Sequence, residues 1–122
     1  MYMKIAVTAQ DGSIDAKMDP RFGRAKYFIV ADSESDELKV VDNSINLNAA
    51  QGAGIQAGRN VAELGVSAVI TGNVGPKAFA VLNECGIKIY TAGDCTVKEA
   101  VEKYRAGELK AVENANVQGH WV

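Results

Sequence analysis

Short apolar runs alternate with helix-forming segments in the last third of the chain, and this alternation limits the possible folds more than any other feature. The apolar runs are residues 66–71 and 87–91, and helix starts follow them at Pro76 and Thr96. Strands joined through a helix almost always lie parallel, with a right-handed crossover. The pattern therefore predicts an α/β fold in which these two strands are parallel.

Three more strands are expected in the first half of the chain. Residues 4–8 form an apolar run, and residues 27–31 and 38–41 are strand-like on either side of the acidic turn 32–37. Such an arrangement indicates a hairpin. A meander followed by two crossover units predicts a mixed five-stranded sheet of order 3-2-1-4-5, with strand 2 antiparallel and helices on its faces.

The expected helices carry recognisable end signals. One helix is predicted over residues 55–64, where Gly58 would let the helix lie close to the sheet. A second is predicted over residues 76–85. The third follows Thr96, which can form a capping box with Glu99. A glycine is expected to end each helix: Gly65, Gly86 and Gly107.

Size and composition indicate one ordinary globular domain. The chain has 122 residues, of which 48% are hydrophobic and 23% charged, and its formal net charge is −2. A chain of this mass buries about two-thirds of its surface, which suits one core and leaves no room for a second. We expect a single domain over residues 1–107 and a surface tail over residues 108–122. The balanced charge gives no strong field for nucleic acid.

The chain shows no targeting or membrane signal. Residues 1–7 lack the long apolar region of a signal peptide, and no window approaches the ~18 apolar residues of a membrane span. These features predict a cytoplasmic protein without membrane contact.

The two cysteines are expected to be reduced thiols, as is usual in the cytoplasm. Cys85 is expected to pack at a helix end, and Cys95 to lie beside a helix start that lowers the pKa of its thiol. The strand 87–91 would separate them by roughly 17 Å, so a disulfide or a shared metal is not expected. Cys95 is the candidate metal ligand.

Four loop segments are expected to meet at one edge of the sheet. In such sheets, ligands bind beyond the carboxyl ends of the parallel strands. The segments are residues 8–11, 51–54, 72–75 and 91–95. Three of them lead into helices, whose free amides and dipoles favour an anion. The glycines in these segments have a simpler explanation as well, because every fold of this kind needs turns there.

The usual catalytic motifs do not fit. Residues 72–77 depart from the Walker phosphate loop, and residues 52–58 depart from the dinucleotide fingerprint. Asp11 and Asp94 are too few carboxylates for a nuclease with paired metals. A Ser/His/Asp mechanism would depend on His120, the single histidine, which lies in the tail. The chain is therefore not expected to be an enzyme.

Three motifs resemble a known family. They are DPRFGRAKYF at residues 19–28, GAGIQA at residues 52–57 and VITGNVGPKAF at residues 69–79. Together they are similar to the dinitrogenase iron–molybdenum cofactor biosynthesis family, which includes NifX- and NafY-type carriers and the C-terminal domain of NifB. The resemblance covers residues 3–107. It implies a ribonuclease H-like three-layer fold and a protein that binds an iron–sulfur cofactor or precursor and passes it on without catalysis.

The chain departs from this family at Arg21, where the cofactor carriers usually have a histidine before the FG motif. Arginine cannot ligate iron, but it can pair with an anionic cluster, a carboxylate or a phosphate. The uncharged segment 43–58 is expected to act as a lid over the site.

The leading hypothesis is a non-catalytic carrier that transiently binds an anionic iron–sulfur or iron–molybdenum-type cluster, with cluster-assembly proteins as partners. The residues expected to bind the anion are Arg21, Gly23, Arg24, Gly52, Gly54, Asn73, Gly75 and Lys77. Two alternatives stay open: a regulatory or scaffold module that recognises a protein partner, and a small phosphate-ester-handling enzyme that uses Asp11 or Asp94.

Overall fold

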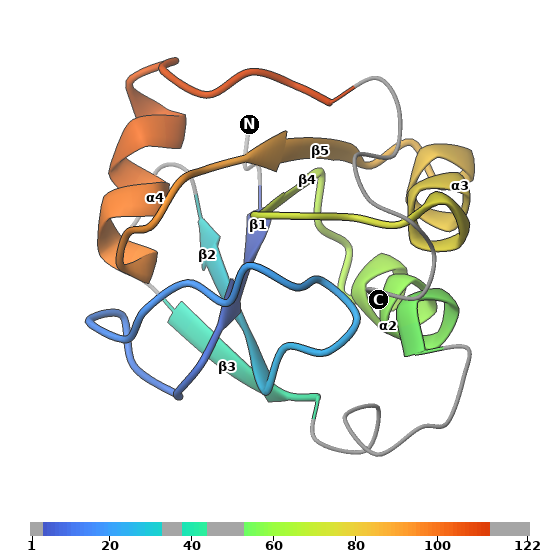
Figure 1. The fold of residues 1–122 in the computed structure, drawn as a ribbon, viewed down its shortest axis with the longest axis horizontal. Coiled ribbons are helices and arrows are strands. Elements are labelled where there is room, and N and C mark those ends of the chain that lie inside the picture. The colour runs from blue at the N-terminus through green and yellow to red at the C-terminus, as the bar shows by residue number, and fades with distance from the viewer. Residues whose placement is uncertain (1–3, 33–37, 44–52, 113–122) are drawn as a thin grey trace.

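A computed structural model describes residues 4–32, 38–43 and 53–112 of the chain (Figure 1). In chain order, the elements are β1 (Lys4–Ala9), β2 (Tyr27–Asp32), β3 (Leu38–Asp42), α2 (Ala53–Glu63), β4 (Ala68–Thr71), α3 (Pro76–Glu84), β5 (Lys88–Thr91) and α4 (Val97–Arg105). Residues 33–37 of the acidic turn, residues 44–52 of the predicted lid and residues 113–122 of the tail, which include His120, lie outside the described residues.

The five strands form one sheet in the order β3-β2-β1-β4-β5. Strand β2 is antiparallel to both of its neighbours, whereas β1, β4 and β5 run parallel. The predicted α/β class, strand order and strand directions are thus confirmed. The carboxyl ends of the three parallel strands lie at the same edge, as the site prediction requires. The name ribonuclease H-like stays a prediction.

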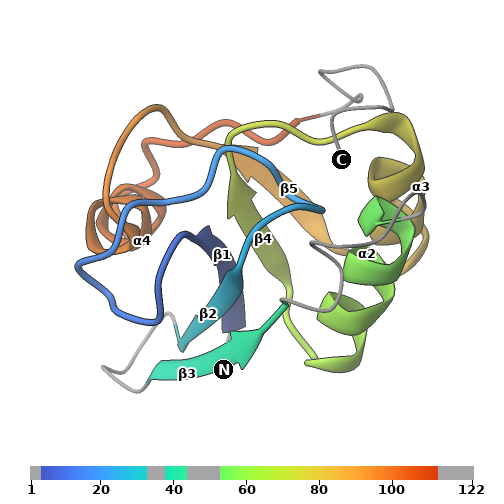
Figure 2. The same ribbon diagram turned by 60° about the horizontal axis from the view of Figure 1, so that its bottom comes forward.

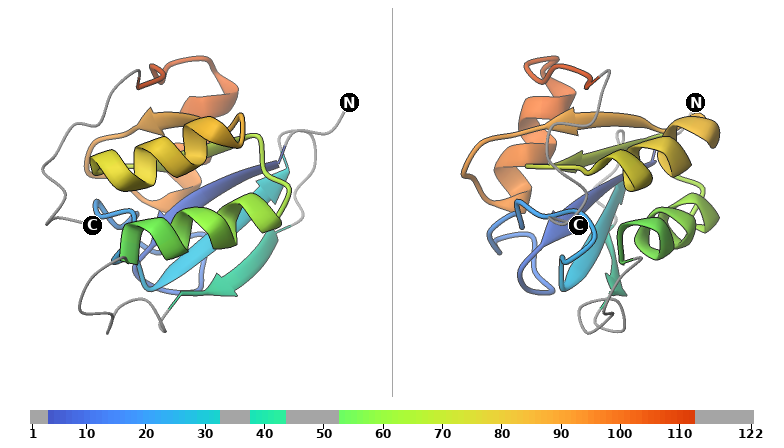
Figure 3. Two further views of the ribbon diagram at one scale, coloured as in Figure 1. Left: turned by 90° about the vertical axis from the view of Figure 1, so that its right-hand side faces the viewer. Right: turned by 45° about the vertical axis from the view of Figure 1, so that its right-hand side comes forward.

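Helices cover both faces of the sheet. Figure 3 shows α2 and α3 side by side over one face, with α4 behind the other. The first face packs on a core that includes Phe22, Phe28 and Leu82. The other face of the sheet packs against α4 in a second core, which includes Ile29 of β2 and Val97 of α4. The result is a helix–sheet–helix arrangement in three layers.

The helix end signals are confirmed. Gly65, Gly86 and Gly107 adopt φ angles of 74°, 73° and 73°, a left-handed conformation that glycine accepts without steric cost. At the start of α4, Thr96 and Glu99 form both hydrogen bonds of the capping box. The first of the helices begins two residues before the predicted start.

Gly58 has a different role from the predicted one. A Cβ atom at this position would lie 3.0 Å from Cγ1 of Val81 in α3. The close neighbour of α2 at Gly58 is therefore the adjacent helix and not the sheet. Both helices lie on the same face, so the small residue sets their spacing within one layer.

The segment after α4 returns to the sheet. Ala111 forms an antiparallel bridge with Tyr90, and the amide of Val112 donates to the carbonyl oxygen of Ile89 at 2.7 Å. Residues 111 and 112 therefore line the outer edge of β5. The domain boundary at residue 107 stays a prediction.

Candidate functional site

The loop after β1 packs tightly against the loop after β4, at Pro20 and Gly72. A Cβ atom on Gly72 would lie 2.8 Å from Cα of Pro20 and 3.0 Å from its carbonyl oxygen. The amide of Asn73 donates to the oxygen of Pro20 at 2.6 Å, and the amide of Phe22 donates to the oxygen of Asn73 at 3.2 Å. Only glycine at position 72 permits this approach. Two motifs that are far apart in the sequence are therefore one structural unit.

A buried hydroxyl pair fixes this unit to the ends of two neighbouring strands. The Thr8 hydroxyl donates to the carbonyl oxygen of Asp19 at 2.6 Å and lies 3.0 Å from Oγ1 of Thr71. The amide of Asp19 donates to the carbonyl oxygen of Thr8 at 2.9 Å. Thr8 and Thr71 are both fully buried. The backbone at Asp19 is thus held by the carboxyl ends of β1 and β4.

The carboxylate of Asp19 holds Arg21. Its Oδ1 atom accepts the Arg21 amide at 2.9 Å and lies 3.4 Å from Nε of the same residue. The Asp19 side chain is 5% exposed, whereas the Arg21 side chain is 49% exposed. The buried acid therefore orients a guanidinium group whose outer part faces solvent.

An open pocket of about 220 Å³ lies next to this pair. Its lining residues are Gln10, Asp19, Arg21, Arg24 and Lys26. Three side chains are cationic, and the single acid is paired with Arg21. We call this hollow the anion pocket. Its charge suits a ligand that carries more than one negative charge, because Arg can bind oxyanions and carboxylates with directed N–H groups.

The structure brings some of the predicted residues together. Arg21 and Arg24 line the anion pocket, and Asn73 forms a parallel bridge with Arg21. Gly23 is buried directly after Phe22. Gly52 lies outside the described residues.

The other predicted residues lie at helix starts. Gly54 is in the first turn of α2, and Gly75 is the N-cap of α3. Lys77 is exposed in the first turn of α3, a helix that has Pro76 at its start and no side-chain cap hydrogen bond. None of these three lines the anion pocket.

The start of α4 does not contribute free amides, contrary to the prediction of three converging helix starts. The amides of Val97 and Lys98 donate to the carbonyl oxygens of Ala16 and Ile14, both at 2.9 Å. The Glu99 amide donates to Oγ1 of Thr96. The loop after β1 passes over this end of the sheet beside α4 (Figure 2). The loop uses the amides that an anion would need.

Cys95 is a core residue, and the expected low pKa is wrong. It is 7% exposed and packs in the same core as Val97 and Val101. Burial raises the pKa of the Cys95 thiol, and Lys103 offsets this only in part. The helix start cannot supply the expected stabilisation, because its amides have other partners. Cys85, expected to be packed, is exposed where α3 ends.

Three pocket residues were not predicted from the sequence: Gln10, Asp19 and Lys26. Asp19 stands at the start of the DPRFG motif, and an Asp before Pro is a common turn signal, so its carboxylate could have been assigned to a turn. Gln10 lies in the segment 8–11 expected at this edge, and Lys26 lies in the motif DPRFGRAKYF, but neither carries a binding signal of its own. They reach the pocket because β1 ends where antiparallel β2 begins.

The described residues contain no group of three or more His, Cys, Asp or Glu side chains that could hold a metal ion. Three of the five side chains that line the anion pocket, those of Arg21, Arg24 and Lys26, are cationic instead. These groups can recognise a cluster through its charge and its outer atoms, and they cannot ligate its metals. Within the part of the chain that is described, no helix is long and apolar enough to cross a membrane.

Comparison with known proteins agrees with this architecture. The orange protein (ORP) from Desulfovibrio gigas, solved in its apo form, superposes with a TM-score of 0.91 at 38% identity, covering 94% of this chain and 97% of that one. The Thermotoga protein TM1290 gives a TM-score of 0.83 at 31% identity, covering 96% and 99%. The protein MJ0580 of Methanocaldococcus jannaschii is 31% identical over 114 residues, 91% of this chain and 92% of its own.

The family model described as "Dinitrogenase iron-molybdenum cofactor" matches residues 3–107. This span contains every described element from β1 to α4 and all five residues of the anion pocket. The chain therefore belongs to the dinitrogenase iron-molybdenum cofactor family.

Proposed function

We propose that this protein is a non-catalytic carrier that binds an anionic iron–sulfur or iron–molybdenum-type cluster at the anion pocket. The observation that carries the proposal is the arrangement of Arg21, Arg24 and Lys26 around a buried acid that orients one of them. Membership of the cofactor family supports a metallocluster as the cargo.

The chemistry of the pocket favours transient binding. Cationic side chains pair with the outer sulfur or oxygen atoms of a cluster and leave its metal–ligand bonds intact. Such contacts form and break without a chemical step, as a carrier requires. The backbone unit at Pro20 and Gly72 holds the Arg21 segment in place before the cargo arrives, which lowers the ordering cost of binding.

The test is anaerobic titration of the purified protein with isolated iron–molybdenum cofactor, followed by gel filtration, metal analysis and the visible spectrum. We expect one cluster per chain in the wild type. Arg21→Ala should weaken binding by about ten- to a hundredfold, as for the loss of a hydrogen bond to a charged group.

Arg59→Ala is the matched control, since Arg59 is an exposed arginine of α2 and does not line the anion pocket. Phosphate and citrate at the same concentration distinguish a general anion site from a cluster site. A wild type that binds no cluster, or an Arg21→Ala variant that binds as well as Arg59→Ala, would contradict the proposal.

A further inference from the structure

The cations of the anion pocket stand on two segments that different parts of the sheet hold. Arg21 belongs to the loop after β1, where Asp19 fixes it beside the ends of β1 and β4. Arg24 and Lys26 belong to the segment that leads into β2. This second segment is held from another direction, by the end of β3.

Asn43, the residue directly after β3, makes two hydrogen bonds to the second segment. Its amide donates to the carbonyl oxygen of Lys26 at 2.9 Å, and its Nδ2 atom donates to the carbonyl oxygen of Ala25 at 2.7 Å. The last pair of the β2–β3 ladder is Tyr27 with Asp42, so the amide bond continues the ladder by one residue. The side chain then continues it by one more, in place of a strand that has ended.

Burial makes these two bonds a strong constraint. Asn43 is 1% exposed, and Ala25 is fully buried. A buried carbonyl oxygen that loses its donor pays a desolvation penalty, so the Ala25 carbonyl is held at the Asn43 side chain. Ala25 stands between Arg24 and Lys26 in the chain. Fixing the carbonyl groups of residues 25 and 26 therefore fixes the backbone from which both cations extend.

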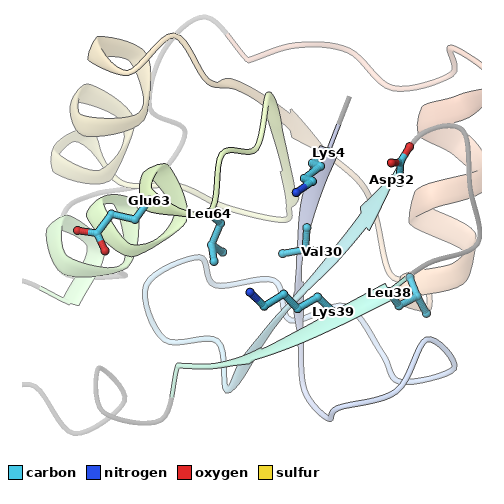
Figure 4. Close-up of a pocket in the computed structure, with 7 residues that line it drawn as sticks. All are labelled: Lys4, Val30, Asp32, Leu38, Lys39, Glu63 and Leu64. Atoms are coloured by element: carbon cyan, nitrogen blue, oxygen red, sulfur yellow. The ribbon is translucent and has the colours of Figure 1, made fainter. Parts of the chain in front are cut away.

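The two ends of β3 differ in the charge that surrounds them. The start of the strand borders a hollow of about 310 Å³ whose charged lining residues are Lys4, Lys39, Asp32 and Glu63 (Figure 4). Two lysines and two acids balance there. The anion pocket, next to the segment that Asn43 holds, has three cations and one acid. An anchor at the Asn43 end therefore acts on the hollow that carries an excess of positive charge.

We propose that Asn43 is a positioning residue of the anion pocket, which holds Arg24 and Lys26 as Asp19 holds Arg21. The inference rests on the proposed function for its ligand, because the placement of cations matters for binding an anion. Cations that are in place before the cargo arrives lower the ordering cost of binding. Sequence patterns assigned Asn43 to the predicted lid, whereas the structure buries it against the segment that carries two of the pocket's cations.

The test is the anaerobic titration with isolated iron–molybdenum cofactor, applied to Asn43→Ala. This variant removes the Nδ2 donor and keeps the backbone amide. We expect binding about three- to tenfold weaker than in the wild type, as for the loss of one hydrogen bond that orders a binding segment. Circular dichroism checks the fold, and Asn43→Ser, a smaller polar replacement, takes the place of Asn43→Ala should the latter be unfolded.

Ile87→Ala is the stability control. Ile87 is buried directly before β5, at the opposite end of the parallel strands from the anion pocket. Its truncation should lower the urea midpoint at least as far as Asn43→Ala, because it leaves a cavity in the core. Its binding should stay within about twofold of the wild type. This comparison separates a role in the pocket from a loss of overall stability.

Two further measurements distinguish positioning from a general effect. Asn43→Ala should cost less affinity in a Lys26→Ala background than in an Arg21→Ala background, because coupled residues are non-additive and Arg21 has its own anchor. The NMR order parameters of residues 24–26 should fall in Asn43→Ala and stay unchanged in Ile87→Ala, with no cargo present.

The outcomes separate this inference from the proposed function. Binding by Asn43→Ala as tight as by Ile87→Ala, equal costs in the two backgrounds, or unchanged order parameters at residues 24–26 would overturn the role of Asn43 and leave the carrier function standing. A wild type that binds no cofactor would overturn the carrier function, and the order parameters would then decide by themselves whether Asn43 holds this segment.

Discussion

Asp19 and Arg21 form a buried-to-exposed pair: Oδ1 of Asp19 accepts the amide of Arg21 at 2.9 Å and lies 3.4 Å from its Nε atom. The Asp19 side chain is buried, whereas the Arg21 side chain is half exposed at the anion pocket. The carboxylate thus acts twice, once on the backbone and once on the guanidinium. It fixes the backbone position of Arg21 and the orientation of its guanidinium group.

Replacing Asp19 should destabilise the fold as well as the pocket. Asp19→Ala removes the acceptor of the Arg21 amide, and we expect a loss of about 1–3 kcal/mol in the free energy of unfolding. Asp19→Asn keeps an acceptor oxygen and should lose less than half as much. Urea unfolding measures both. Asp15→Ala, at an exposed acid of the same loop, should change little; equal losses at both positions would contradict the role given to Asp19.

Gly72→Ala should separate the two loops of the site. The added Cβ atom would meet the Pro20 backbone at 2.8 Å, well inside normal contact, so one of the loops must move. We expect a loss of about 1–3 kcal/mol in thermal or urea unfolding, typical of overpacking, together with weaker cluster binding. Gly93→Ala is the control, because nothing lies within 4 Å of a Cβ atom there. The interpretation fails if both alanines are tolerated equally.

The two thiols should differ in reactivity. Cys85 is exposed, whereas burial raises the pKa of the Cys95 thiol, so less of the reactive thiolate forms at a given pH. At pH 8, Ellman's reagent should modify one thiol per folded chain and both in urea. Cys85→Ser should abolish the fast reaction and Cys95→Ser should leave it. Rapid modification of two thiols in the folded wild type would show that Cys95 is accessible.

The capping box predicts a pH-dependent contribution to stability. Hydrogen bonds from the backbone amide and side chain of Thr96 hold the pKa of Glu99 below its ordinary value. A lowered pKa in the folded state stabilises above the ordinary pKa of the carboxyl group, and the gain disappears as the pH falls through the lower value. The difference in Tm between wild type and Glu99→Gln should therefore be present at pH 7 and shrink toward pH 3. Glu102→Gln, on the exposed side of α4, serves as the control. A Glu99→Gln difference that persists unchanged at pH 3 would contradict this assignment.

The strand order and the helix ends were accessible from local patterns. Alternation of strands and helices dictates parallel neighbours, and the glycines that end the helices adopt the positive φ angles expected of them. The capping box is equally local, since Thr96 and Glu99 are one helical turn apart. Arg21 and Arg24 could be assigned to the site because they stand in one loop next to the end of β1.

What depended on contacts between distant segments could not be predicted in this way. The amides at the start of α4 are used by the loop after β1, which removed one expected anion-binding helix and left Cys95 in the core. Gly58 faces α3 and not the sheet, since two helices share one layer.

The sequence by itself determined the α/β architecture, the family motifs and the loop that carries Arg21, because each of these is encoded by neighbouring residues. Only the tertiary structure decided that Asp19 orients Arg21, that Gly72 admits Pro20 and that the hydroxyl groups of Thr8 and Thr71 meet. The physical reason is that hydrogen bonds and steric contacts depend on distances in space, and residues 20 and 72, or 8 and 71, become neighbours only when the sheet has formed.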